Sequence, residues 1–184
     1  MRVLFRTNAI DDRVKKTLVE TLYTQPANLA VGAATGVMAS LLTASIADIP
    51  AIWHVAIALS VVAVARVVLA LVLPRMVNRD SRRLELLYEV GAFTFSAQLG
   101  LLAALAVWFR VEASAQLLIV GYAIGYGAGI AARNAGRPMI SIGQMVLTFF
   151  PIILALWQDG DIGRKGLAVA IVLLWLGMIS ITMK

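Results

Sequence analysis

Six long apolar blocks, separated by short polar connections, occupy most of this chain. They span residues 27–46, 51–73, 86–108, 113–132, 139–157 and 166–183. Each block is close to the roughly 20 residues that a helix needs to cross a bilayer. A backbone in lipid must satisfy its own hydrogen bonds, so helices are expected, and the blocks lack the alternation typical of β-barrel strands. The pattern predicts an all-α integral membrane bundle of six transmembrane helices.

Residues 1–25 are polar and mixed in charge, and they precede the predicted transmembrane domain at residues 26–184. Within the first segment, Val14, Leu18 and Leu22 recur every four residues. This spacing is typical of a short amphipathic helix. Two roles are open for it, namely a juxtamembrane helix at the lipid headgroups and a contact with a partner. No apolar run followed by a small-residue cleavage site is present, so a signal peptide is not predicted.

The positions of the cations predict that both termini lie in the cytoplasm, because cytoplasmic loops are enriched in Lys and Arg. Of the 16 Lys and Arg, five precede the first block, four lie between the second and third, two lie between the fourth and fifth, and the last is Lys184. The opposite side holds only Arg110, Arg164 and Lys165, and Arg66 lies within a block.

The composition excludes several functional classes. Charged residues make up 14% of the chain, against about a quarter in a soluble domain. The net charge of +6 follows from the basic loops and does not indicate nucleic-acid binding. Cysteine is absent and His54 is the single histidine, which excludes disulfides, ordinary zinc sites and bis-histidine haem ligation. No catalytic motif occurs, so the chain is predicted to be neither an enzyme nor a cofactor or metal carrier.

Glycines spaced four apart mark one face of two predicted helices. They are Gly121, Gly125 and Gly129 in the fourth block, and Gly32 and Gly36 in the first. Such spacing lets two helix backbones approach closely in lipid. Three roles are open: tight packing within the bundle, a dimer face, and a ligand pocket beside the bare backbone. In the first of these roles the two faces could dock on each other.

Two charged residues, Arg66 and Glu89, lie inside the blocks, where charge is costly and tends to be structural or functional. Arg66 precedes Pro74 by eight residues and Glu89 follows Arg83 by six, which places them roughly 12 Å and 9 Å inside the membrane. Adjacent antiparallel helices would bring them to similar depth. The sequence therefore predicts an intramembrane Arg66–Glu89 ion pair, either structural or a switch. In the alternative, Arg66 extends to the headgroups and Glu89 protonates.

Polar and basic side chains from the third block to the fifth are candidate contacts for a ligand or for lipid headgroups. The connection after the fourth block carries arginines, which bind phosphate through two parallel hydrogen bonds. The candidate contacts are Tyr122, Tyr126, Arg133, Asn134, Arg137, Gln98 and Gln144.

A set of these residues follows the order seen in a known family. The set is Leu22, Tyr23, Pro26, Trp53, Arg66, Gly121, Tyr122, Gly125, Ala128, Gly129, Ala131, Arg133, Asn134, Gly136, Arg137 and Pro138. In this order, residues 20–184 resemble the N-terminal six-helix membrane regions that precede GGDEF, GGDEF–EAL or histidine-kinase modules in proteobacterial signalling proteins. The chain itself contains no GGDEF, EAL or kinase sequence.

The resemblance implies a transmembrane sensory or regulatory domain of the bacterial inner membrane, acting as a homodimer. Its last helix would relay a signal to a cytoplasmic effector C-terminal to residue 184, either an enzyme of cyclic-di-GMP signalling or a kinase. The alternative is a small membrane transporter or channel. Transporters usually place charged or unwound helix segments at the membrane midplane, and the midplane here is poor in charge.

Overall fold

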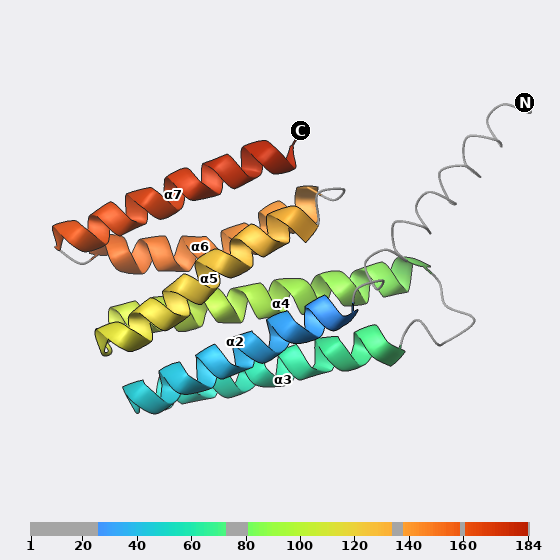
Figure 1. Cartoon of the computed structure of the whole chain (residues 1–184), viewed down its shortest axis with the longest axis horizontal. Coiled ribbons are helices and arrows are strands. Elements are labelled where there is room, and N and C mark those ends of the chain that lie inside the picture. Colours follow the sequence, from blue (N-terminus) through green and yellow to red (C-terminus); the bar gives the residue numbers. More distant parts are fainter. Residues whose placement is uncertain (1–25, 73–80, 134–137, 159–160, 184) are drawn as a thin grey trace, which may run out of the picture.

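A computed structural model describes residues 26–72, 81–133, 138–158 and 161–183 as a bundle of helices (Figure 1). The helices are α2 (Pro26–Ala47), α3 (Pro50–Val72), α4 (Ser81–Trp108), α5 (Ala113–Arg133), α6 (Pro138–Gln158) and α7 (Ile162–Thr182). No strand occurs in these ranges. The prediction of an all-helical fold with six helices long and apolar enough to cross a membrane is confirmed. The predicted amphipathic helix before residue 26 lies outside the described part.

Consecutive helices run in opposite directions, so α2 begins and α7 ends at the same end of the bundle (Figure 1). Helices α2 and α3 form a hairpin that packs on α4 through α3. The most extensive helix pair is α4 with α6, and α5 crosses over the bundle to contact α2, α4, α6 and α7. Helix α7 packs mainly on α6, makes a smaller contact with α5, and is the most peripheral element. The interior is therefore built around α4 and α6.

The helix starts follow from local sequence. Pro26, Pro50 and Pro138 are the first residues of α2, α3 and α6. Proline suits this position because its fixed φ is helical and the N–H that it lacks has no partner within the first turn. Helix α7 instead begins after Asp161, whose side-chain oxygen accepts a hydrogen bond from the backbone N–H of Gly163 at 3.0 Å. The aspartate is therefore an N-cap.

Two tight turns use non-glycine residues in the left-handed region, Asp48 with φ 50° and Arg110 with φ 51°. At the end of α4, the N–H of Val111 donates to the carbonyl of Ala106 at 3.2 Å, and the N–H of Arg110 donates to Val107 at 3.1 Å. This pair of bonds is a Schellman cap. It satisfies carbonyls that would otherwise lack partners and reverses the chain into α5 within four residues.

Helices α4 and α6 approach backbone to backbone at Gly100. A Cβ added there would overlap the carbonyl oxygen of Leu147 and lie 2.7 Å from that of Thr148. Pro151 lies inside α6, four residues after Leu147, and a proline has no N–H to bond the carbonyl four positions earlier. The Leu147 carbonyl, which lacks this bond, lies beside Gly100, whose Cα–H groups can act as weak donors.

Candidate functional site

The ring of Phe95 on α4 connects four helices in the interior. Phe95 is 2% exposed. The Cζ atom of Arg66 on α3 lies 5.1 Å from its ring centroid, a cation–π contact. The ring of Tyr126 on α5 lies 5.2 Å away at 52°, and a Cβ added to Gly36 on α2 would lie 3.1 Å from the Phe95 Cζ atom. One aromatic ring thus joins α2, α3, α4 and α5.

Tyr122 on α5 ties this region to α2. Its hydroxyl donates to the backbone carbonyl of Gly32 at 2.8 Å. The same hydroxyl would lie 2.6 Å from a Cβ at Gly36, so a larger residue at position 36 has no room. Its ring stacks on that of Tyr126 with centroids 6.4 Å apart. Gly36 is therefore glycine because the two rings of Tyr122 and Phe95 fill the space beside it.

The hydroxyl of Tyr126 faces two polar side chains. It lies 3.1 Å from the Ser96 Oγ atom on α4 and 3.1 Å from the Gln144 Oε1 atom on α6. A phenol carries one hydrogen, so Tyr126 cannot donate to both. Ser96 Oγ also lies 2.9 Å from the Ala92 carbonyl. Either Ser96 donates to Tyr126 and loses its bond to Ala92, or it keeps that bond and competes with Gln144 for the phenol hydrogen.

Gln144 leaves one end of its amide without a partner. The residue is 2% exposed, and its Nε2 atom has no hydrogen-bond partner in the described structure. A buried donor without a partner costs about 1–3 kcal/mol. We refer to Arg66, Phe95, Ser96, Tyr122, Tyr126 and Gln144 as the polar cluster. It draws on α3, α4, α5 and α6 and is bonded to α2 through Tyr122.

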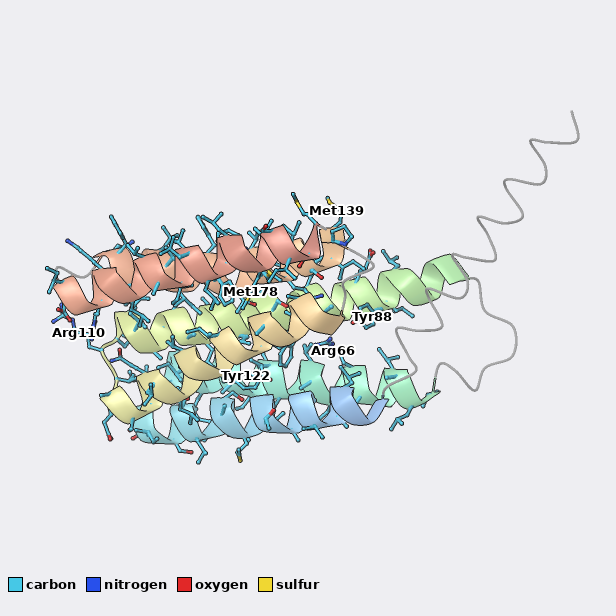
Figure 2. The ribbon with its side chains drawn as sticks, turned by 45° about the horizontal axis from the view of Figure 1, so that its top comes forward. Arg66, Tyr88, Arg110, Tyr122, Met139 and Met178 are labelled. Carbon is cyan, nitrogen blue, oxygen red and sulfur yellow. The ribbon has the colours of Figure 1, made fainter. Side chains whose placement is uncertain are left out.

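The Arg66 side chain runs inward. A Cβ added to Gly91 on α4 would lie 3.1 Å from its Cγ atom and 3.8 Å from its Nε atom, whereas its Cζ atom lies over Phe95, four residues further along α4. Four residues correspond to about 6 Å along a helix. Helical side chains lean toward the N-terminus of their helix, which for α3 is the end opposite its connection to α4. Figure 2 shows Arg66 inside the bundle. Arg66 therefore does not extend to the near end of α3, as the headgroup alternative required.

The predicted Arg66–Glu89 ion pair is not formed between these two residues in the structure. The α4 residues that face Arg66 are Gly91 and Phe95, four apart on one side of the helix. Glu89 precedes Gly91 by two residues, which turns it about 200° around the helix axis. The prediction considered only how deep Arg66 and Glu89 lie along the membrane normal. The two side chains leave their helices in different directions, and this separates the charges.

The two glycine faces have different surroundings. A Cβ added at Gly121, Gly125 or Gly129 would meet no atom within 4 Å, and the same holds for Gly32. Gly36 alone of the five is packed, against Tyr122 and Phe95. The two faces therefore do not dock on each other, and the α5 glycines point out of the bundle. The α5 glycines therefore do not serve tight packing within the bundle, which was one of the three roles considered for them.

Three of the seven candidate contacts come together. Tyr122, Tyr126 and Gln144 belong to the polar cluster. Gln98 is separate: it follows Gly91 by seven residues, which places it on the same side of α4, and its buried Oε1 atom has no partner in the described structure. The side chain of Arg133, together with Asn134 and Arg137, lies outside the described residues.

The sequence did not single out Phe95, the center of the cluster. A phenylalanine inside an apolar block looks the same whether it faces lipid or the interior. The only signal was indirect: Gly91 stands one turn before Phe95, and a small residue one turn before an aromatic leaves room on that face for a long side chain from a neighbouring helix.

Comparisons with models of protein families, with curated proteins and with solved structures give no match. The class of the protein therefore follows from its own architecture. It is a multi-pass membrane protein, with six apolar helices in its described part and a polar cluster shared by α3, α4, α5 and α6.

Removing the Tyr126 hydroxyl is expected to destabilise the bundle mildly. Tyr126→Phe leaves both ends of the Gln144 amide unpaired and should lower the free energy of unfolding by about 1 kcal/mol, within the range for hydrogen bonds between membrane helices. Gln144→Leu removes the unpaired donor and should be close to neutral. Unfolding in mixed detergent–SDS micelles, followed by circular dichroism, measures both.

The double variant Tyr126→Phe/Gln144→Leu tests whether the two side chains act together. We expect it to be more stable than Tyr126→Phe alone, because the amide that lost its partner is gone. Strictly additive losses would show that the two residues do not interact.

Proposed function

We propose that this chain is a transmembrane sensory or regulatory domain, which relays a signal through α7 to a cytoplasmic effector. The observation that carries the proposal is the single phenol hydrogen of Tyr126, placed between Ser96 and Gln144 at 3.1 Å from each. An element with two alternative bonding partners has two possible arrangements. A signal that favours one of them shifts the population between the two.

The cluster has a route to α7. Gln144 is on α6, and α6 is the helix that α7 packs against most extensively. The buried residues of α7 form one stripe: Ala168, Ile171, Met178 and Thr182. The remaining large apolar side chains of α7 are mostly exposed. A shift of α6 would therefore move α7 as a rod, because few other contacts hold it.

In this proposal both termini are cytoplasmic, in a bacterial inner membrane, and the effector follows residue 184. It would be an enzyme of cyclic-di-GMP signalling or a kinase, as the family resemblance implies. The residues that carry most of the cation asymmetry lie outside the described ranges, so the support for this orientation is the charge distribution of the sequence.

A reporter fusion tests the sensory role. A diguanylate cyclase module of known activity is fused after Lys184, and cyclic-di-GMP is measured in cells at equal expression. Tyr126→Phe removes the shared hydrogen and is expected to change the output about fivefold or more, the effect of a coupling free energy of 1 kcal/mol or above. Phe150→Leu, on the exposed side of α6, is the matched control and should leave the output unchanged. Equal output from all three fusions would contradict the proposal.

A small transporter or channel remains the competing function, and Arg66 inside the bundle is the observation that favours it. Against it, each of the six described helices is continuous from end to end, whereas transporters commonly bind substrate at broken helices. Uptake into liposomes driven by an ion gradient and abolished by Arg66→Gln would replace the sensory proposal.

The homodimer is proposed through the exposed α5 glycines. Gly121, Gly125 and Gly129 present bare backbone outward, and this spacing allows two helices to pack closely in lipid. Gly125→Leu is expected to abolish the dimer in fluorescence energy transfer between labelled copies in liposomes. Gly177→Leu on α7, where a Cβ also meets nothing, is the matched control and should leave the dimer intact. Energy transfer that survives Gly125→Leu would exclude this face.

A further inference from the structure

The charge of Arg66 is incompletely compensated. Arg66 is half-buried within an apolar span and its guanidinium lies over the buried ring of Phe95, where a charge is costly, and contact with one aromatic ring offsets only part of that cost. In the described part of the chain no carboxylate forms an ion pair with it. A guanidinium offers five N–H donors in a fixed plane, so the site favours a group that supplies acceptor oxygens and one negative charge.

A second observation points the same way. The Nε2 atom of Gln144 is buried and has no partner in the described structure, and the other end of the same amide bonds Tyr126 within the polar cluster. The rings of Phe95 and Tyr126 connect Arg66 to Gln144, and the ring of Tyr122 stacks on that of Tyr126. The cluster is thus rich in unpaired donors, with aromatic surface beside them, and it suits a ligand that combines acceptor oxygens with an apolar body.

We propose that the polar cluster binds a carboxylate, held by Arg66. A carboxylate carries one charge, which matches one guanidinium; a doubly charged phosphate would leave a buried negative charge without a partner. Its two oxygens also match the planar fork of arginine. This inference rests on the proposed sensory function and names the class of signal. The carboxylate belongs either to a fatty acid from the bilayer or to a short-chain acid from water.

Binding to the full chain tests the proposal directly. The protein is placed in nanodiscs of phosphatidylcholine, and oleate labelled with ¹³C at the carboxyl carbon is titrated and followed by ¹³C NMR. We expect a saturable signal with one oleate per chain, distinct from oleate in empty nanodiscs. Labelled butyrate is titrated in parallel. Saturable binding of oleate identifies the membrane as the source, and saturable binding of butyrate alone identifies water as the source.

Variants of Arg66 assign the site. Arg66→Gln is expected to weaken binding about 10-fold to 100-fold, the loss of one charge-assisted hydrogen-bonded contact. Arg66→Lys keeps the charge without the planar fork and should fall in between. Lys165→Gln removes one positive charge from the start of α7, far from the cluster along the chain, and should bind as the parent does. Circular dichroism and thermal midpoints confirm that each variant is folded.

Two results would overturn the proposal. One is no saturable binding of either acid to the parent chain. The other is equal binding to the parent and to a folded Arg66→Lys or Arg66→Gln variant. Because this experiment involves no effector, its outcome is separate from that of the reporter fusion: binding with a silent fusion would leave the site standing and remove the sensory function.

Discussion

Replacing Gly100 by alanine is expected to separate α4 from α6 and to lower the free energy of unfolding by about 3 kcal/mol or more, beyond the usual range for an extra methyl in a core. The added Cβ would overlap the Leu147 carbonyl oxygen and lie 2.9 Å from the Thr148 Cα atom. Both are backbone atoms, which cannot rotate away as a side chain can. The most extensive helix pair of the bundle would have to open by the thickness of a methyl group.

Gly125→Ala is the matched control for Gly100→Ala. A Cβ there meets nothing within 4 Å, and alanine favours a helix over glycine by about 1 kcal/mol, so this variant should be as stable as the parent or more stable. Unfolding in mixed detergent–SDS micelles, below the concentration at which copies associate, measures both variants. If Gly100→Ala is no less stable than Gly125→Ala, the close approach of α4 and α6 is absent.

Phe95→Ala is expected to have the second largest effect, a loss of about 3 kcal/mol. This is the low end of the range for truncating a buried phenylalanine, because apolar groups gain little from leaving lipid for a protein interior. The change removes contacts with Gly36 and Tyr126 and takes the ring from under the Arg66 guanidinium. The cavity and the unsupported charge act in the same direction.

Phe150→Ala tests whether the loss comes from burial. Phe150 is 52% exposed on α6, so lipid fills the space left by its ring, and a change below about 0.5 kcal/mol is expected. A second comparison isolates the cation–π contact: Phe95→Leu should cost less in an Arg66→Met background than in the parent. Equal losses for Phe95→Ala and Phe150→Ala would mean that the ring of Phe95 is not enclosed by the other helices.

The helices were predictable because each apolar block is long and continuous. The predicted blocks and the observed helices agree closely, and the clearest differences are that α4 starts at Ser81 and α7 at Ile162, before their apolar runs at 86 and 166. The start of α7 depends on a polar residue, because Asp161 caps this helix from outside the apolar run. An analysis of hydrophobicity alone cannot see a helix that continues into polar sequence.

The candidate site was predictable only in part. Tyr122, Tyr126 and Gln144 stood out because polar side chains are scarce in apolar blocks, and the structure joins them. The glycine spacing was also visible, but it did not show what each face contacts. The α5 glycines at four-residue spacing face outward, whereas Gly36 and two glycines outside these repeats, Gly100 and Gly127, have neighbouring atoms close to them. Spacing identifies a face of a helix and leaves open what that face meets.

The sequence by itself determined that six apolar helices make up this chain, where each lies, and which few polar residues they carry, because the length and composition of a segment decide whether it can cross lipid. Only the tertiary structure decided which faces meet. The rotation of each helix about its own axis turned Arg66 toward Phe95 and away from Glu89, placed Gly100 against the carbonyl that Pro151 leaves free, and brought Tyr126 between Ser96 and Gln144. In lipid, apolar and interior surfaces are alike in hydrophobicity, so packing and hydrogen bonding set that rotation.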